Sequence, residues 1–292
     1  MMINKDDKNL LKYKLIELEN FQSKSWYDIT ITQIFFRMSE PEIREVWASN
    51  LEEEFMKISE LVEKYQYVAM DTEFPGFIVK SSQSFNTTEE QRYHTQSMNV
   101  NILHIIQIGI TLCDAQGNLC TPCPTWQFNF KFSLTEDLHT PEAINLLTQA
   151  NIDFTKFERD GIEVMDFTPL LYASGLVMNE DVVWISFHGG YDFAYLLKML
   201  TSSPLPSTED EFFQQLKIFF PHFYDIKYMM FLTDQKICGL QDIATQLDVI
   251  RYGTQHQAGS DSLVTLQTFY AFNQRHYGGK LTHERFRNNL YG

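Results

Sequence analysis

Several stretches of the chain carry the alternating or continuous apolar pattern of β-strands. The segment YVAMDTEFPG predicts a strand at Tyr67–Glu73 that ends at a Pro-Gly pair. HIIQIGITLCD and TWQFNFKFSL predict two more strands, joined through the turn AQGN. VVWISFH predicts a buried strand at Val182–His188, and another is expected at about Tyr224–Met229. The predicted order is a three-strand meander followed by two further strands.

One face of the TWQFNFKFSL strand carries an aromatic stripe, made of Phe128, Phe130 and Phe132. A stripe of this kind can stack nucleobases. Packing in the core of a sheet is the more common use of such residues, and it is the interpretation that we favour here.

Helical periodicity covers most of the remaining chain. The first predicted helix spans residues 39–65 and starts with the capping pattern Ser39-x-x-Glu42, whereas residues 81–98 are polar and predict a loop. Further helices are predicted at Pro141–Gln149, Phe167–Ala173, within GGYDFAYLLKML, and at Glu209–Phe219, Leu240–Leu247 and Ser260–Asn273. This order favours an α/β fold, a mixed sheet flanked by helices as in ribonuclease-H-like proteins, preceded by an extension over residues 1–40.

The strand at Tyr67–Glu73 ends with two carboxylates. Side chains two residues apart on a strand share a face, so Asp71 and Glu73 are expected to lie close together. Like charges at that distance raise each other's pKa, and a hard divalent cation with oxygen ligands is a natural counter-charge. An exposed Asp-x-Glu at a strand end is the alternative, and this pair alone does not exclude it.

Three more residues stand where the chain turns into helices. Asp192 follows a Gly-Gly turn between a predicted strand and helix, and Asp261 opens the last helix in QHQAGSDSLVTL. Each also fits a simple role in a first helical turn, where the helix dipole favours an acid. His256 lies five residues before Asp261 in a Gly-containing loop, where a histidine is usually a polar surface group. Asp225 is interpreted as structural.

Composition narrows the class of protein. The chain has 292 residues and a net charge of −15, which disfavours broad electrostatic binding to nucleic acid. The four cysteines fit a reducing compartment, and the single CxxC, at Cys120 and Cys123, lacks a second pair at zinc spacing. No apolar run reaches the length of a membrane span and the N-terminus lacks a signal-peptide core, so we expect a soluble intracellular protein without a membrane partner.

Taken together, the acidic residues indicate a cation-binding site more strongly than any of them does alone. Four carboxylates on converging elements, Asp71, Glu73, Asp192 and Asp261, can hold two divalent cations about 3.5–4 Å apart, which is an arrangement for in-line phosphoryl displacement. A nearby His256 can accept the proton of the attacking water. Because no thiolate takes part, Mg²⁺ or Mn²⁺ suits the set better than zinc.

With these motifs in place the chain resembles the DEDD exonuclease superfamily, in its subgroup with a histidine. More closely it is similar to the Caf/Pop-type deadenylases, the CCR-four-associated factor one family of the CCR–NOT complex. The matching stretches are IREVWASNLEEEF, YVAMDTEFPGF, IIQIGITL, TWQFNFKF, WISFHGGYDFAYLLK, FFPHFYDIKYMM and QHQAGSDSLVT. They span about Ile43 to Phe269, within a predicted exonuclease domain at 41–277 that is followed by a tail at 278–292.

The resemblance implies roles for the matched residues. Asp71 would bridge both cations, Glu73 and Asp261 would complete one site, and Asp192 would help to hold the other. His256 would be the general base. The implied reaction is 3′-to-5′ removal of adenosines from mRNA poly(A) tails, with release of 5′-AMP.

The resemblance also implies partners and a place in the cell. The expected partners are poly(A) RNA, the NOT scaffold subunit and a leucine-rich-repeat deadenylase. The expected localisation is cytoplasmic, including mRNA-decay foci, with the nucleus as a further compartment. From the residues themselves, Phe74, Phe187 and His188 flank the expected cations and are candidates for contact with the terminal nucleotides, although His188 equally fits a packed position at the strand end.

Two other functions fit the same residues. One is a DEDD exonuclease that acts on DNA or on structured RNA, because motif spacing does not select the sugar. The other is a non-catalytic subunit that uses the fold to bind a scaffold.

Overall fold

The central element of the fold is a six-stranded mixed β-sheet with the strand order β1-β4-β3-β2-β5-β6. A computed structural model describes residues 40–80, 89–233, 235–280 and 284–291, and the chain from Pro41 onwards forms one unit. The strands are β1 (Ile43–Val46), β2 (Tyr67–Glu73), β3 (Gln107–Cys113), β4 (Thr125–Asn129), β5 (Val183–Ser186) and β6 (His222–Asp225). The predicted meander is present, since β2, β3 and β4 pair antiparallel in sequence order. The other three pairings are parallel.

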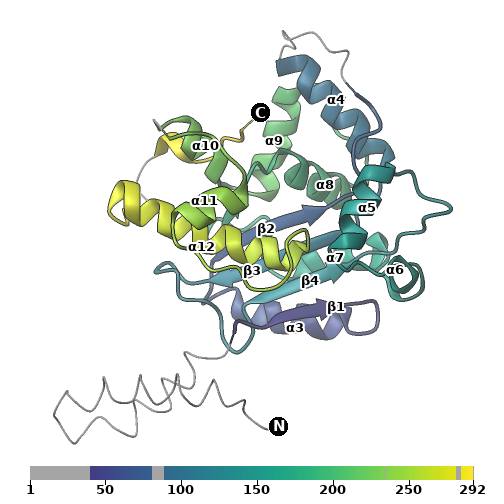
Figure 1. Ribbon diagram of the computed structural model, residues 1–292, viewed down its shortest axis with the longest axis horizontal. Helices are drawn as coiled ribbons and strands as arrows, with labels where there is room; N and C mark the ends of the chain where they lie inside the picture. The colour runs from purple at the N-terminus through teal and green to yellow at the C-terminus, as the bar shows by residue number, and fades with distance from the viewer. Residues whose placement is uncertain (1–39, 81–88, 234, 281–283, 292) are drawn as a thin grey trace, which may run out of the picture. The chain divides into compact units, whose positions relative to one another are not determined.

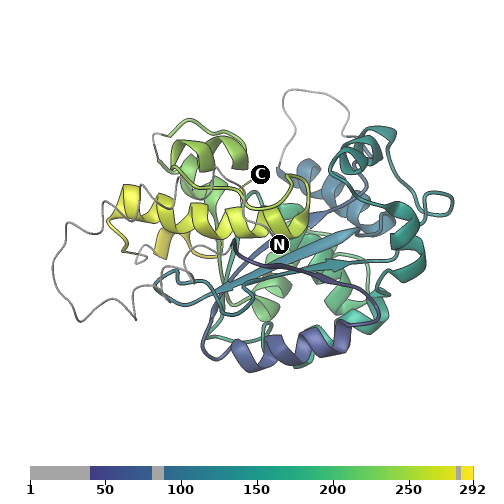
Figure 2. The same ribbon diagram turned by 60° about the horizontal axis from the view of Figure 1, so that its bottom comes forward.

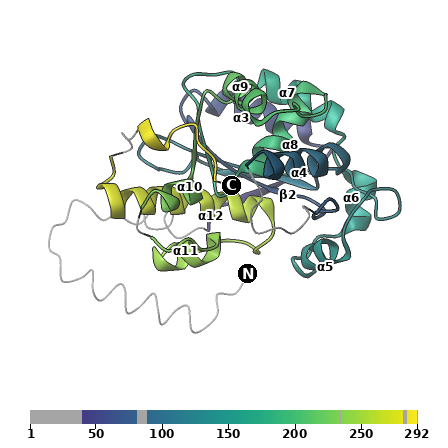
Figure 3. The ribbon, with the colours of Figure 1, turned by 90° about the horizontal axis from the view of Figure 1, so that it is seen from above.

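Helices cover both faces of this sheet (Figure 1). In the described part of the chain they are α3 (Leu51–Leu61), α4 (Glu89–Ile102), α5 (Pro141–Gln149), α6 (Phe154–Asp160), α7 (Val164–Ala173), α8 (Gly190–Thr201), α9 (Glu209–Phe219), α10 (Ile226–Phe231), α11 (Leu240–Gln246) and α12 (Ala258–Tyr277). The long α12 lies across β2, β3 and β4 on one face, while α3 lies on the other side of the sheet, as Figure 2 shows. Viewed from above in Figure 3, α8 and α4 also lie on the side opposite α12, and they pack against each other.

The alternation of side chains along β2 separates the two layers. Val68 and Met70 point into the hydrophobic cluster shared with α3 and α8, whereas Ala69 belongs to the cluster shared with Phe269 of α12. Residues of odd number on β2 therefore face α12, and residues of even number face α8. This register decides where the acidic end of the strand points. The aromatic stripe of Phe128, Phe130 and Phe132 is buried, as favoured from the sequence.

Three local predictions are wrong. Residues 43–46, expected to be helical, form the edge strand β1, because this segment, with a β-branched residue at each end, pairs in parallel with β4. Ser39 lies outside the described residues, so its expected cap is not described, and α3 begins only at Leu51. The predicted loop at 81–98 contains the start of α4, whose inner side carries Tyr93, Ser97 and Val100 at helical spacing among polar neighbours. Residues 81–88 lie outside the described chain.

The third error concerns the last strand. The predicted strand at Tyr224–Met229 is instead β6 followed at once by α10, because Asp225 caps that helix through the N–H groups of Lys227 and Tyr228. The short helix α6 was not predicted. The remaining helices agree with the predicted ranges within a few residues, and α5 and α9 match them at both ends.

The C-terminal residues return to the sheet. Asn288 exchanges hydrogen bonds with Phe223 of β6 through its backbone N–H and its side-chain oxygen, and Phe286 is buried beside α12. The Tyr291 N–H reaches the Asp225 carboxylate. The predicted boundaries at residues 40 and 277 stay predictions. Within the described residues, no helix combines the length and the apolar character needed to cross a membrane.

Candidate active site

The first carboxylate pair lies at the end of β2 on the face that looks toward α12. Asp71 pairs in register with Gly109 of β3, and Glu73 pairs with Gln107. Both carboxylates are partly buried and line one cleft of about 520 Å³, which we call the acidic cleft. Thr72, between them, points to the opposite face and donates its hydroxyl to the Asp192 carboxylate. One strand therefore contributes to the site from both of its faces.

The first turn of α12 approaches this strand unusually closely. A β-carbon at Gly109 would lie 1.9 Å from the carbonyl oxygen of Ala258, so no other residue fits at that position without a shift of backbone. Two glutamines of the sheet satisfy the free N–H groups of the helix start. Gln107 accepts from Ala258 N at 3.2 Å, and Gln127 accepts from Gly259 N at 2.8 Å. The helix start is thereby fixed to the sheet beside Asp71.

This docking places Asp261 and His256 at the acidic cleft. Asp261 is buried in the first turn of α12, and its Oδ2 accepts the backbone N–H of His256 at 2.8 Å. His256 has a left-handed backbone with φ of 63°, and its side chain lines the acidic cleft together with the carboxylates. Arg251 Nη1 lies 2.6 Å from Asp261 Oδ1 and also donates to Ser260.

Asp192 comes from the opposite face of the sheet, on the first turn of α8. The turn from β5 into α8 is held by Asp225 at the end of β6, whose carboxylate accepts the N–H groups of His188 and Gly189 at 2.9 and 3.1 Å. Asp192 is buried and lines the acidic cleft together with Asp71. The structural interpretation of Asp225 agrees with these contacts, since it positions the turn that presents Asp192.

The electrostatics of the cleft favour a bound cation. Burial, followed by repulsion from Asp261 and Asp192, raises the pKa of Asp71 and of Glu73 well above their ordinary ranges. Burial also raises the pKa of Asp192 to about 7, against the opposing effect of the Thr72 hydrogen bond. Arg251 offsets only part of this negative charge. The four carboxylates therefore repel one another in a poorly solvated site.

The donor set fits hard divalent cations. The ligand atoms of Glu73, His256 and Asp261 lie within 4.8 Å of one another, and Asp71 and Asp192 face the same cleft. Carboxylate oxygens without thiolates are the ligands that Mg²⁺ and Mn²⁺ prefer. Positive charge would also relieve the repulsion that raises the carboxylate pKa values. The five residues singled out from the sequence are thus brought together on one cleft.

The three residues expected to touch substrate also line the acidic cleft. Phe74 stacks on the rings of Tyr191 and Tyr195, with centroids 5.4 Å apart in each case. His188 is exposed to solvent, yet its ring packs edge-on against Tyr291 with centroids 5.5 Å apart, and its Nδ1 lies 3.3 Å from Lys227 Nζ. Their contact with a substrate stays a prediction.

Sequence reasoning missed several residues of the site. Arg251, Gln257, Phe77 and Tyr191 were given no role from the sequence, although the last three lie within the stretches that match the family. Gln257 accepts from both Gln107 and Gln127, and its own amide donates to the Ala150 carbonyl at 2.7 Å. A polar residue next to His256 was the available signal, but only the fold shows that it joins the helix start to the sheet.

A mixed sheet with four convergent carboxylates and a histidine at one edge is the arrangement typical of the DEDD exonuclease class. The CAF1 family ribonuclease model matches residues 46–168 and 174–269, and the chain belongs to this family. It is 48% identical over 250 residues to the poly(A) ribonuclease pop2 of Schizosaccharomyces pombe, covering 86% of this chain and 74% of that protein. It is 45% identical to the probable CCR4-associated factor 1 homolog 7 of Arabidopsis thaliana, covering 89% of this chain and 96% of that protein.

Solved structures agree with this assignment. The S. pombe Pop2p structure in its Mg²⁺- and Mn²⁺-bound form superposes with a TM-score of 0.82 at 48% identity, over 85% of this chain and 98% of that one. A chain in the structure of the yeast NOT1 MIF4G domain co-crystallised with CAF1 gives a TM-score of 0.73 at 30% identity, over 87% of this chain and 100% of that one. Exonuclease I, at 10% identity, shares the fold with a TM-score of 0.50 over 74% of this chain and 43% of its own. The predicted ribonuclease-H-like fold is confirmed.

Proposed function

We propose that the protein is a deadenylase, a 3′-to-5′ exoribonuclease that shortens poly(A) tails and releases 5′-AMP. The observation that carries the proposal is the convergence of four carboxylates and His256 on the acidic cleft. Membership of the CAF1 ribonuclease family and the high identity to a poly(A) ribonuclease support the choice of RNA over DNA.

The carboxylates hold the cations. Glu73 and Asp261, with Asp71 on the same face of β2 as Glu73, would form one group of ligands, while Asp192 would reach the cleft from the α8 side. Two divalent cations bound there supply charge that stabilises the attacking and leaving oxygens of the displacement. Thr72 and Asp225 keep Asp192 in place, the first through its hydroxyl and the second through the turn before α8. The S. pombe structure with Mg²⁺ and Mn²⁺ supports this choice of metals.

His256 is the proton acceptor of the proposed reaction. Its ring lies within 4.8 Å of the ligand oxygens of Glu73 and Asp261, a span that one water molecule can bridge. The water gives up a proton to the imidazole and attacks the phosphorus atom. The P–O3′ bond to the penultimate nucleotide then breaks, and the leaving O3′ oxygen takes a proton from solvent water, which leaves 5′-AMP and a shortened chain with a new 3′-hydroxyl.

The wall of the cleft receives the terminal nucleotide. Phe74 offers a ring that Tyr191 and Tyr195 hold rigid, and Phe187 lies near Lys227 with its ring centroid 5.8 Å from Nζ. These rings can stack a base, while His188 offers a polar group to a phosphate or sugar.

The proposal includes a place in a larger assembly. With a net charge of −15, the isolated chain should attract RNA poorly, so efficient action calls for tethering. A NOT scaffold subunit and a leucine-rich-repeat deadenylase are the proposed partners. A yeast CAF1 co-crystallised with the NOT1 MIF4G domain supports the first of them. Action in the cytoplasm, including mRNA-decay foci, and in the nucleus is part of the same proposal.

The test is a time course on three 5′-labelled substrates: an RNA ending in twenty adenosines, the same RNA without the tail, and a DNA copy. Each is incubated with Mg²⁺, with Mn²⁺ and with a chelator. A metal-dependent ladder that stops at the tail boundary, with 5′-AMP as product, is expected. Digestion of the DNA or of the RNA body would instead indicate a general exonuclease. No digestion in any condition would favour a non-catalytic scaffold subunit.

A further inference from the structure

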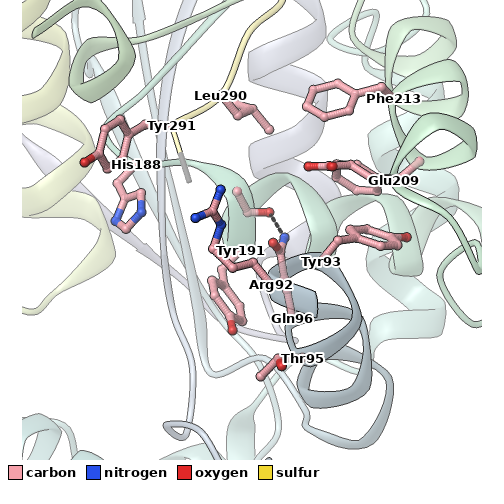
Figure 4. Close-up of a pocket in the computed structure, with 12 residues that line it drawn as sticks. Arg92, Tyr93, Thr95, Gln96, His188, Tyr191, Glu209, Phe213, Leu290 and Tyr291 are labelled. Atoms are coloured by element: carbon pink, nitrogen blue, oxygen red, sulfur yellow. Dashed lines mark hydrogen bonds between the residues drawn. The ribbon is translucent and has the colours of Figure 1, made fainter. Parts of the chain in front are cut away.

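A second cavity opens beside the acidic cleft. It has a volume of about 250 Å³ and lies between α4, α8, α9 and the C-terminal residues 290 and 291; we call it the side pocket. His188 and Tyr191 line both the side pocket and the acidic cleft, so the two cavities share a wall. Figure 4 shows His188 and Tyr291 on one side of the side pocket and Tyr93, Glu209 and Phe213 on the other, with Arg92 and Tyr191 between them.

The walls of the side pocket combine flat apolar surface with polar edges. Tyr191 and Phe213 offer ring surface, and both are only partly buried. Gln96 spans from α4 to α8, where its amide donates to the Gly190 carbonyl at 2.6 Å, as the dashed line in Figure 4 shows. That hydrogen bond fixes the plane of the Gln96 amide, whose oxygen can accept a hydrogen bond. Rings with a fixed amide at their edge match the requirements of a nucleobase.

Positive charge lies at the border of the two cavities. Lys227 Nζ is 3.3 Å from His188 Nδ1 and 5.3 Å from the ring centroid of Tyr291, and Arg92 lines the side pocket. Arg251 also lines the acidic cleft and Glu209 lines the side pocket, so the border carries both signs of charge, and Lys227 and Arg92 are its cations nearest to His188 and the side pocket. A chain of phosphates that leaves the cleft here would pass within reach of both.

The volume limits what the side pocket can hold. At about 250 Å³ it lies just below the range of about 300–1,000 Å³ that is typical of pockets for drug-sized ligands, which suits a ligand of the size of one purine base. A folded segment of protein does not fit into this space, and a bare ion would leave the rings without a contact.

We propose that the side pocket is a base-binding subsite for single-stranded RNA, which takes one adenine on the 5′ side of the scissile bond. This inference rests on the proposed function, because it assumes that the terminal nucleotide occupies the acidic cleft. His188 and Tyr191 form the partition between the two bases. Lys227 and Arg92 contact the phosphates that connect them. Recognition of an internal base makes the enzyme sensitive to the substrate beyond the nucleotide that it removes.

The test combines abasic substrates with a variant that fills the side pocket. Ten-nucleotide adenosine RNAs are made with a single abasic site at the second, third, fourth or fifth position from the 3′ end, and removal of the first nucleotide is timed. Thr95→Trp adds a ring at the pocket wall, where Thr95 is partly buried on α4. The matched control is His94→Trp, the same substitution at the exposed neighbouring position outside the side pocket.

The wild-type protein should lose about fivefold or more in rate at one abasic position, the scale of one base stacked on an aromatic ring. The loss should vanish in Thr95→Trp, because the occupied pocket no longer takes the base, and should persist in His94→Trp. Phe213→Leu, which removes a ring from the wall, should reduce the same loss. The same abasic profile in all four proteins would overturn the proposal.

A separate measurement distinguishes failure of the subsite proposal from failure of the proposed function. Should the wild-type protein degrade none of these RNAs, the proposed function fails. Fluorescence anisotropy with the labelled ten-nucleotide RNA, in Ca²⁺ instead of Mg²⁺, then decides the subsite. Weaker binding by Thr95→Trp than by His94→Trp supports it, and equal binding overturns it.

Discussion

Gly109 of β3 lies directly against Ala258 at the start of α12, so that a β-carbon on Gly109 would be 1.9 Å from the Ala258 carbonyl oxygen. The contact joins backbone to backbone, and no side-chain rotation can relieve it. Gly109 is also the register partner of Asp71. The distance between Asp71 on the sheet and Asp261 on the helix is therefore set by the absence of a side chain at position 109.

Gly109→Ala should push α12 away from the sheet. We expect a loss of about 1–3 kcal/mol or more in the free energy of unfolding, and a larger proportional loss of nuclease activity, because His256 and Asp261 move with the helix. Urea unfolding and initial deadenylation rates measure the two effects. Gly190→Ala is the control for folding, since its β-carbon would lie at an ordinary 3.6 Å from the Gln96 amide. Full activity in Gly109→Ala would contradict the close approach.

Asp192→Ala removes a proposed metal ligand and a buried negative charge from the acidic cleft. Activity should fall by more than about 100-fold, while the melting temperature in chelator is maintained or rises, because desolvation already penalises this carboxylate. Circular dichroism melting beside the rate measurement separates the outcomes. A collapse of the melting temperature would mean that Asp192 acts mainly as a structural group in the first turn of α8.

Asp225→Asn tests the turn that presents Asp192. The Asp225 carboxylate is fully buried and accepts five backbone N–H groups, from His188, Gly189, Lys227, Tyr228 and Tyr291. An amide at this position would set an NH₂ group against some of these donors. We expect a loss of about 1–3 kcal/mol in stability and a fall in activity. Asp181→Asn, at an exposed position before β5, is the matched control and should change neither.

The pH dependence of the metal-free protein follows from the raised pKa of Asp71. Its ordinary value is 3.8, and burial with neighbouring carboxylates places the folded value well above it. The folded state therefore retains a proton that the unfolded chain releases, and this group makes the protein less stable as pH rises through that interval. In chelator, Asp71→Asn should melt several degrees above the wild type at pH 7.5, and the gap should narrow at pH 5.5.

Other carboxylates, such as Glu54 and Asp114, have lowered pKa values and make stability depend on pH in the opposite sense. Their contribution is the same in both proteins, so it cancels when the two melting temperatures are compared at each pH. A gap that is absent at pH 7.5, or that widens on acidification, would contradict the crowded-carboxylate description. Added Mg²⁺ should raise the melting temperature of the wild type more than that of Asp71→Asn.

Much of the site could be predicted from sequence because its chemistry lies at element boundaries. Asp71 and Glu73 end a strand, and Asp192 and Asp261 open helices, so their places followed from hydrophobic period and turn residues alone. The register of β2 against β3 was not predictable, because it depends on pairing across the sheet. The same holds for the caps from Gln107 and Gln127, whose partners lie more than a hundred residues away.

The errors in the fold have a similar origin. β1 is a short edge strand of four residues with only one buried side chain, and its pairing with β4 outweighs a local helical period. The polar sequence of α4 led to the prediction of a loop, but packing against α8 holds this segment as a helix. In both places tertiary contacts decide the structure, and a single sequence does not display them.

The most direct test of the central claim is the rate of 5′-AMP release from a twenty-adenosine RNA in Mg²⁺ by wild-type protein and by Asp71→Asn, with both melting curves recorded. We predict a fall of more than about 1000-fold in rate, with a melting temperature in chelator at or above that of the wild type. A variant that is equally stable and retains activity within tenfold of the wild type would contradict the claim that these carboxylates carry the reaction.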